Sequence, residues 1–191
     1  MVCIEVCSAA YVFDGTMRSS VVNSLFGDGC GAVVVTARAP DNPGNEPGVL
    51  RYSSRTIPEA SGAMRYDWDD DQGKFSFYLD PAIPYVIGAH AEETIRALLA
   101  GTGLSRTDIA HWIVHSGGKK VIDSVRVNLR LTRHDLRHTS GVLSSFGNLS
   151  SASFLFSYER LLRDDVAEPG DYGVLMTMGP GSTIETALLR W

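Results

Sequence analysis

The sequence has few basic residues and no long apolar run, and each shortage excludes a class of protein. Its 17 lysines and arginines are outnumbered by 22 aspartates and glutamates, for a formal net charge of -5. A nucleic-acid surface normally needs a basic stripe, so that class of partner is not expected. The apolar runs are too short to cross a bilayer, and residues 1 to 7 lack the layout of a signal peptide. We therefore expect a cytoplasmic protein that acts on a small molecule, with no membrane partner.

Cysteine is also scarce, with only Cys3, Cys7 and Cys30 in the chain. An odd number of cysteines in apolar or glycine-rich segments favours buried, reduced thiols over a disulfide framework. The sequence has no Cys-x-x-Cys pair of the kind that binds zinc.

Two polar clusters have an alternative interpretation as cation sites. His134 and His138 flank Asp135, and an acidic run covers residues 67 to 71. No third ligand is evident near the histidines, and the acidic run lacks the twelve-residue pattern of a calcium loop. A solvated turn and a solvent-facing loop between two strands are the better interpretations, so the sequence predicts no metal site.

The order of apolar segments predicts a layered α/β domain. With 191 residues and 44% hydrophobic content, the chain has the size of one ordinary domain. Residues 2 to 7 predict a strand buried on both faces, and a glycine-rich turn at 25 to 31 leads into a strand at 32 to 35. Residues 38 to 48 are richest in proline and glycine and predict a linker. Further strands are expected near 49 to 57, 74 to 79, 112 to 114, 173 to 177 and 182 to 189, and helices near 81 to 100, 119 to 131 and from 148 onward.

Three short stretches place polar groups where strands end or helices begin, which is the usual place of a site in such folds. His115 ends a buried strand and is followed by Gly117 and Gly118, which let a ligand approach the backbone. Asn148 stands at a predicted helix start, where its plain explanation is an N-cap. A glycine-proline-glycine turn at 179 to 181 either joins two strands or shapes a pocket wall.

Together these stretches resemble the thiolase-fold condensing enzymes, specifically the type III polyketide synthases of the chalcone and stilbene synthase family. The matching motifs are Leu-Phe-Gly-Asp-Gly at 25 to 29, His-Ser-Gly-Gly at 115 to 118, Gly-Asn-Leu-Ser-Ser at 147 to 151 and Gly-Pro-Gly at 179 to 181. The resemblance implies a thiolase-like α/β/α layered fold, mainly its C-terminal half. Residues 1 to 38 would end the N-terminal half, and residues 39 to 191 would form the C-terminal domain.

The resemblance also implies an activity: decarboxylative condensation of malonyl-CoA units, followed by cyclisation to an aromatic product. His115 and Asn148 match the residues that stabilise charge on the thioester oxygen. Phe26 matches the gatekeeping aromatic, and Phe77 falls near a second one. Gly117 and Gly118 would lie along the pantetheine arm, and Gly179, Pro180 and Gly181 would border the cyclisation cavity.

The family further implies a homodimer that needs no metal or organic cofactor beyond coenzyme A thioesters. Two segments, His-Ser-Gly-Gly-Lys-Lys-Val-Ile-Asp and Asp-Leu-Arg-His-Thr-Ser-Gly-Val-Leu, resemble the bacterial 3,5-dihydroxyphenylacetyl-CoA synthases. That subfamily supplies the dihydroxyphenylglycine unit of glycopeptide antibiotics.

The chain departs from the family pattern at several positions. Ser116 stands where the family usually has proline, and Ala9 and Tyr11 stand where plant members carry small polar cavity residues. The family's nucleophilic cysteine precedes the strand matched by residues 2 to 7, so we expect it outside this chain. The three cysteines present are poor substitutes because their apolar surroundings favour a neutral thiol.

Two alternatives therefore stay open at this point. A β-ketoacyl-acyl-carrier-protein synthase III shares the fold and the Phe-Gly-Asp-Gly turn, but usually shows His-Gln-Ala-Asn where this chain has His-Ser-Gly-Gly at 115 to 118. A non-catalytic fragment or subunit that binds an acyl thioester is the other, and the missing cysteine supports it.

Overall fold

The computed structural model describes residues 1 to 37 and 46 to 191. The predicted domain boundary after residue 38 and most of the predicted linker lie outside the described residues. Short 3-10 helices are labelled η. The elements are β1 (Val2–Glu5), α1 (Cys7–Ala10), α2 (Met17–Leu25), β2 (Gly29–Ala32), β3 (Gly48–Thr56), η1 (Pro58–Ala63), β4 (Met64–Asp69), β5 (Lys74–Leu79), α3 (Ile83–Leu99), η2 (Arg106–Asp108), β6 (Ile109–Val114), α4 (Lys119–Asn128), α5 (Arg137–Phe146), η3 (Ser150–Ala152), α6 (Ser153–Asp164), β7 (Tyr172–Gly179) and β8 (Thr183–Arg190).

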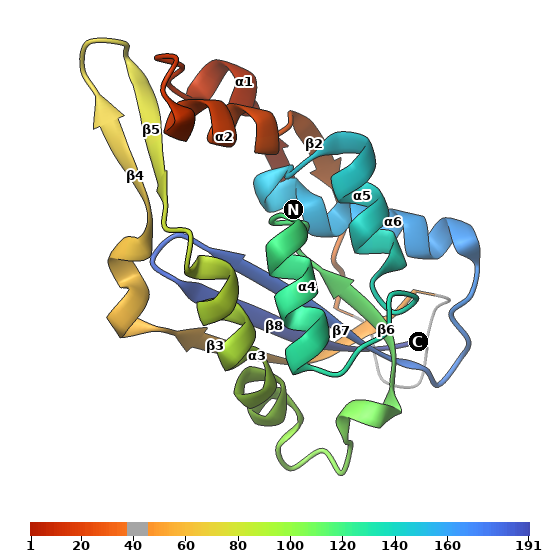
Figure 1. The fold of residues 1–191 in the computed structure, drawn as a ribbon. Coiled ribbons are helices and arrows are strands. Elements are labelled where there is room, and N and C mark those ends of the chain that lie inside the picture. Colours follow the sequence, from red (N-terminus) through yellow and green to blue (C-terminus); the bar gives the residue numbers. More distant parts are fainter. Residues whose placement is uncertain (38–45) are drawn as a thin grey trace.

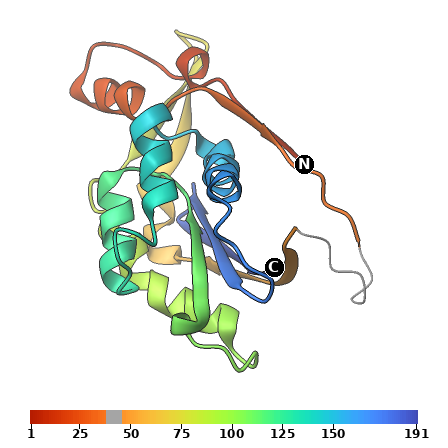
Figure 2. The ribbon, with the colours of Figure 1, turned by 90° about the vertical axis from the view of Figure 1, so that its right-hand side faces the viewer.

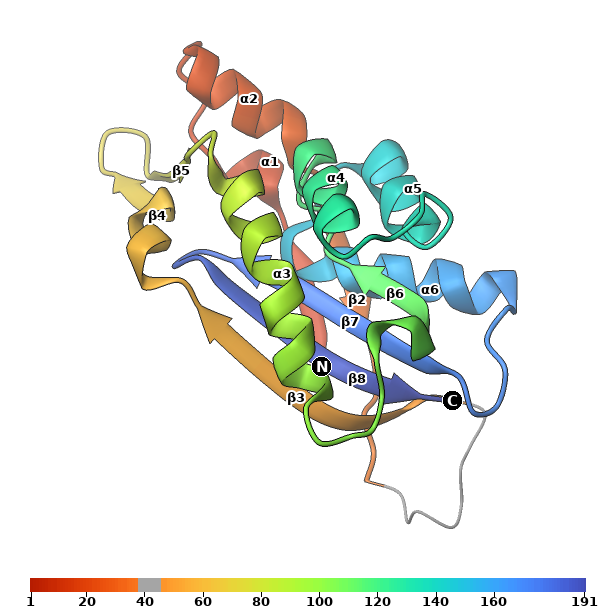
Figure 3. The same cartoon turned by 60° about the horizontal axis from the view of Figure 1, so that its bottom comes forward.

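A four-stranded mixed sheet, in the order β3-β8-β7-β6, forms the middle layer of the molecule. β6 runs parallel to β7, and the other two pairs are antiparallel. Helices α3 and α4 cover one face of this sheet and α6 covers the other (Figures 1 and 3). Strands covered on both faces are expected to be continuously apolar, as the end of β6 from Trp112 to Val114 and the middle of β7 are. The predicted layered α/β architecture is therefore present.

Helix α3 shows why the apolar spacing predicted a helix here. Its residues Ile83, Ile87, Ala91, Ile95 and Leu98 recur every three or four positions, and all are at most 2% exposed. They pack on the sheet beside the buried face of α4.

In residues 1 to 37 and 46 to 191, a second, separate sheet consists of β1 and β2, which pair antiparallel to form the β1/β2 ribbon. Cys3 and Gly31 face the molecule, where Gly31 lies so close to Leu155 of α6 that an added Cβ would come within 2.9 Å of its side chain. Val2 and Ile4 point the other way and are 63% and 66% exposed. The prediction that this strand is buried on both faces is wrong for the described residues, because nothing in them covers the outer face (Figure 2).

β4 and β5 form a hairpin that extends from one end of the layers (Figure 1). The sequence predicted an acidic loop over residues 67 to 71, but Asp67 to Asp69 belong to β4. Aromatic side chains opposite one another across the hairpin, such as Trp68 and Phe75 with ring centroids 5.0 Å apart, outweigh the poor strand propensity of aspartate.

Other differences concern α5, α6 and β2. No helix was predicted at Arg137–Phe146, which is rich in serine, threonine and glycine; burial of residues such as Val142 stabilises it despite this composition. The last helix, predicted from residue 148, begins only at Ser153. The strand predicted at 32 to 35 lies instead at Gly29–Ala32, mostly within the residues predicted as a glycine-rich turn. Among the described residues, no helix is long and apolar enough to span a membrane.

Candidate active site

His115 and Asn148 meet at a cavity of about 310 Å³ near the carboxyl end of β6. A smaller cavity of about 50 Å³ adjoins it and shares both residues. The larger cavity is lined mainly by aromatic, apolar and hydroxyl side chains, including Phe26, Tyr66, Phe77, Ser150, Met178 and Pro180. Two polar groups that converge on a largely apolar cavity are typical of a binding site for a small molecule.

The end of β6 is fixed on both of its edges, which sets the position of His115. Toward β7, the His115 amide donates to the Met176 carbonyl at 2.8 Å. On the other edge, the buried Thr139 hydroxyl of α5 donates to the Val114 carbonyl at 2.9 Å and accepts from the Val114 amide at 3.2 Å. One side chain thus satisfies both outward-facing backbone groups of the last strand residue.

The His115 imidazole is a neutral hydrogen-bonding group at pH 7. Burial lowers its pKa to about 4, because desolvation disfavours the charged form. Gly117 lies against the ring, and a Cβ at this position would come within 3.2 Å of Nε2. Glycine at 117 therefore leaves this nitrogen uncovered on the side of the smaller cavity.

Asn148 is held by a close crossing of two chain segments. Its amide donates to the Leu25 carbonyl and its carbonyl accepts from the Gly27 amide, each at 2.9 Å. A Cβ on Gly27 would lie 2.1 Å from the Phe146 carbonyl oxygen, so only glycine permits this approach. Ser116, at the position where the resemblance suggests proline, donates from its buried hydroxyl to the Gly147 carbonyl at 3.5 Å and connects the two motifs.

The Asn148 side chain has a defined orientation. Its Oδ1 accepts a hydrogen bond from the Ser150 amide at 2.9 Å, while its Nδ2 makes only a long contact of 3.5 Å with the Gly117 carbonyl. The amide nitrogen is therefore available as a donor at the cavity. Ser150 has a φ of +48°, a strained value for serine that is common near functional sites. Asn148 precedes η3 and is not the N-cap of α6, so the N-cap interpretation is wrong.

Phe26 and Phe77 form one aromatic wall of the cavity. Their rings meet edge to face with centroids 5.3 Å apart, although they are 51 positions apart in sequence. Tyr11 and Tyr66 extend the cluster, since each lies within about 6 Å of the Phe77 ring. The structure thus brings together the two aromatic residues that the sequence identified separately.

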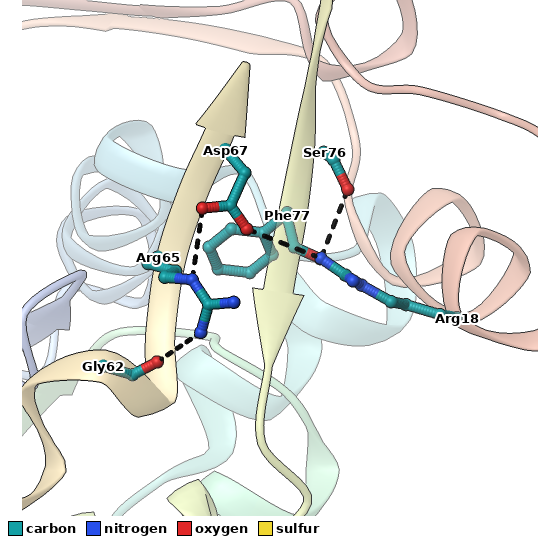
Figure 4. A network of polar contacts seen from close by, with 6 residues as sticks. All are labelled: Arg18, Gly62, Arg65, Asp67, Ser76 and Phe77. Atoms are coloured by element: carbon teal, nitrogen blue, oxygen red, sulfur yellow. Dashed lines mark hydrogen bonds and ion pairs between the residues drawn. The ribbon is translucent and has the colours of Figure 1, made fainter. Parts of the chain in front are cut away.

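A polar network ties the hairpin that carries Phe77 to helix α2 (Figure 4). Arg18 donates to the Phe77 carbonyl at 3.4 Å and to the Ser76 hydroxyl at 3.2 Å, and it lies 4.0 Å from Asp67. Asp67 also pairs with Arg65 at 3.1 Å. These side chains are about half exposed, so their ion pairs add little stability and the aromatic packing dominates.

The remaining predicted residues are distributed around the site. Gly117 lines the smaller cavity, and Gly179 and Pro180 line the larger one. Gly118 precedes α4 with a φ of +143° and lies against Leu25, whereas Gly181 has a φ of +79° in the β7–β8 turn; neither contributes to the cavity lining.

Several residues at the site were missed by sequence reasoning. Tyr66, Met178 and Thr183 line the larger cavity, and Thr139 fixes the strand end. Apolar residues at alternate positions, Met64, Tyr66 and Trp68, were the signal that could have identified β4 and its cavity-facing tyrosine.

The cysteines contribute nothing to the cavity lining in the part of the chain that the structure describes. All three are free thiols. Cys7 is buried, and desolvation raises its pKa, whereas Cys30 is exposed, contrary to the prediction of burial.

His138 pairs with Asp164 at 2.8 Å. Within residues 1 to 37 and 46 to 191, no group of three potential metal ligands comes together.

Comparison with known proteins gives consistent matches. Residues 50–191 match the family model of the chalcone and stilbene synthases, C-terminal domain. The 3,5-dihydroxyphenylacetyl-CoA synthase of Amycolatopsis balhimycina is 66% identical over 191 residues, covering 100% of this chain and 51% of that protein. The 1,3,6,8-tetrahydroxynaphthalene synthase of Streptomyces peucetius subsp. caesius is 35% identical over 189 residues, covering 98% and 50%. The chain thus spans about half the length of these relatives.

The fold is shared with a solved structure of the same kind. The crystal structure of 1,3,6,8-tetrahydroxynaphthalene synthase from Streptomyces coelicolor A3(2), a bacterial type III polyketide synthase, superposes with a TM-score of 0.90 at 32% identity. The match covers 100% of this chain and 53% of that one. The prediction of a thiolase-like α/β fold, of which this chain makes up about half, is confirmed.

Proposed function

The chain belongs to the chalcone and stilbene synthase family, and we propose that it supplies the charge-stabilising part of a type III polyketide synthase active site. The reaction would be decarboxylative condensation of malonyl-CoA units and cyclisation to an aromatic product such as 3,5-dihydroxyphenylacetyl-CoA. The 66% identity to a synthase of that name supports this product. The family match also favours this function over that of a β-ketoacyl-acyl-carrier-protein synthase III.

The observation that carries the proposal is the convergence of His115 and Asn148 on one cavity. When malonyl thioester loses carbon dioxide, the electron pair of the broken bond forms an enolate whose oxygen becomes negative. A neutral imidazole N–H and the Asn148 amide N–H would both donate to that oxygen. Such preorganised donors in a dry site are each worth about a hundredfold or more in rate.

The nucleophilic cysteine would come from a segment that packs on the outer face of the β1/β2 ribbon. Val2 and Ile4 on that face are exposed, and within the described residues each ribbon strand pairs only with the other. The relatives contain about as many residues again as this chain, and the matching family model is that of a C-terminal domain. The N-terminal half of the family's fold is therefore the proposed occupant of this face.

The remaining parts of the proposal follow the relatives. Malonyl-CoA would be the substrate and coenzyme A a product, and no metal or organic cofactor would be required. We further propose a homodimer located in the cytoplasm, with a product used in glycopeptide antibiotic synthesis. The name of the Amycolatopsis balhimycina relative, 3,5-dihydroxyphenylacetyl-CoA synthase, supports a coenzyme A thioester as the product.

A reconstitution assay tests the proposed function. This chain would be mixed with the separately produced N-terminal half of the Amycolatopsis balhimycina synthase, and coenzyme A release from malonyl-CoA would be measured. We expect release only from the mixture. His115→Ala and Asn148→Ala should each lower it by about a hundredfold, whereas the exposed control His134→Ala should leave it unchanged.

Two results would contradict the proposal. Sustained release by this chain alone would show that the nucleophile lies within it. An assembled mixture that binds malonyl-CoA without releasing coenzyme A would favour a thioester-binding subunit instead.

A further inference from the structure

Two tyrosine hydroxyls face each other beside the Phe26 and Phe77 rings of the cavity wall. The oxygens of Tyr11 and Tyr66 are 3.1 Å apart. Tyr66 lines the larger cavity together with His115 and Asn148, whereas Tyr11 lies behind it and does not contribute to the lining. Their exposures differ accordingly, at 41% for Tyr66 and 5% for Tyr11.

The difference in burial decides the direction of this hydrogen bond. Each phenol has one proton to donate and lone pairs to accept. A buried donor must find its partner inside the protein; the Cys7 sulfur near Tyr11 is only a weak acceptor, so the Tyr66 oxygen is the better one to receive the Tyr11 proton. Tyr66, once it accepts, keeps its own proton for a ligand in the cavity, beside the Ser150 hydroxyl that it also contacts there.

The surroundings of Tyr11 hold its ring in place. It stacks on Phe77 with centroids 6.0 Å apart and meets Phe26 edge to face at 5.1 Å. The next backbone amide, of Val12, donates to the Phe75 carbonyl of β5 at 2.9 Å. Desolvation raises the pKa of both tyrosines, so both remain protonated donors at pH 7.

We propose that Tyr11 is a positioning residue that aims the Tyr66 hydroxyl proton at the 3-oxo oxygen of a β-ketoacyl thioester in the cavity. This inference rests on the proposed function, because a growing polyketide carries a carbonyl acceptor at every second carbon. The Phe26 and Phe77 rings beside Tyr66 offer that oxygen no conventional hydrogen bond. Tyr66 would therefore distinguish an oxidised from a reduced third carbon, and Tyr11 would set the direction of its donor.

Paired ligands test the inference on this chain directly. Acetoacetyl-CoA and butyryl-CoA have the same carbon chain and differ in the 3-oxo oxygen, and calorimetry gives the Kd of each. We expect the chain to bind acetoacetyl-CoA about three- to tenfold more tightly, the range of one net hydrogen bond. Tyr66→Phe should abolish this preference, and Tyr11→Phe, which keeps the stacked ring, should remove most of it. Tyr52→Phe, at a highly exposed position on β3, is the matched control.

The outcomes separate the inference from the proposed function. A preference that survives Tyr11→Phe overturns the inference and leaves the proposed function intact. Equal weakening of both ligands by Tyr11→Phe also overturns it, since a purely structural role affects both alike. If the unaltered chain binds neither thioester, both the inference and the proposed thioester site in this chain are wrong.

Discussion

The β1/β2 ribbon and the four-stranded sheet are built from similar apolar strands but differ in what covers them. In the sheet, Ile113 of β6 and Val174 of β7 are fully buried between helices. In the ribbon, Val2 and Ile4 of β1 are largely exposed, although their sequence predicted the same burial. An apolar strand sequence therefore indicates that a face will be covered, but not which part of a protein covers it.

The sharpest test of this comparison is the same substitution in both places. Ile113→Ala removes a side chain packed against α6 and should lower the free energy of unfolding by about 2 to 5 kcal/mol. Ile4→Ala removes an exposed side chain and should change it by less than about 0.5 kcal/mol. Urea denaturation followed by circular dichroism measures both values. Similar losses in the two variants would mean that the ribbon's outer face is already covered, for example by a second copy of the chain.

Acid should destabilise the region of the four-stranded sheet, where His115 is buried at the end of β6. The strands of the ribbon contain no histidine and should not contribute to this effect. The folded pKa of His115 is about 4, below its ordinary value of 6.5, so the folded state binds fewer protons. Stability should then fall as the pH drops from about 6.5 to 4, by at most about 3 kcal/mol from His115. His138, whose pKa burial also lowers, acts in the same direction.

Urea denaturation at several pH values between 4 and 7 measures this dependence. His115→Gln should flatten it, and the exposed control His134→Gln should not. A dependence unchanged by His115→Gln would show that the imidazole is not desolvated in the folded chain. Aspartates whose pKa values are lowered in the folded state, such as Asp123, lose their contribution only at lower pH.

Substitutions on the outer face of the ribbon should affect the affinity for the proposed N-terminal half far more than the free energy of unfolding of this chain. Ile4→Asp places a charge on the exposed outer face and should weaken association by about tenfold or more, because binding would bury that charge. Tyr52→Asp, on an exposed position of β3, is a charge-matched control. Analytical ultracentrifugation of the mixed halves gives both affinities. An effect of Tyr52→Asp as large as that of Ile4→Asp would indicate that the interface includes the edge of the four-stranded sheet.

The parts of the fold that were predictable from sequence are those whose pattern is local. The regular spacing in α3 and the apolar run at the end of β6 each identify their element. α5 could not be predicted in this way, because packing around Val142 stabilises it against its own composition. β4 was obscured by aspartates whose cost is offset only by aromatic residues on the opposite strand.

The candidate site shows the same division. His115 and Asn148 were identified from their motifs, and the structure places both at one cavity, while their catalytic roles remain predictions. The orientation of the Asn148 amide depends on Ser150, and the contact between Phe26 and Phe77 depends on the hairpin position. The alternating apolar residues of β4 could have placed Tyr66 on a strand, but its hydrogen bond to Tyr11, 55 positions away, depends on the fold and is encoded by no local pattern.

The Thr139 hydroxyl also has a consequence for solubility. Among the described residues, β6 is the last strand of its sheet, and its outer edge ends beside His115. Unpaired backbone groups on such an edge invite a strand from another molecule to add to the sheet. By engaging both outward groups of Val114, Thr139 closes the edge next to the site. A side chain of one helix thus protects the mouth of the site from intermolecular strand addition and aggregation.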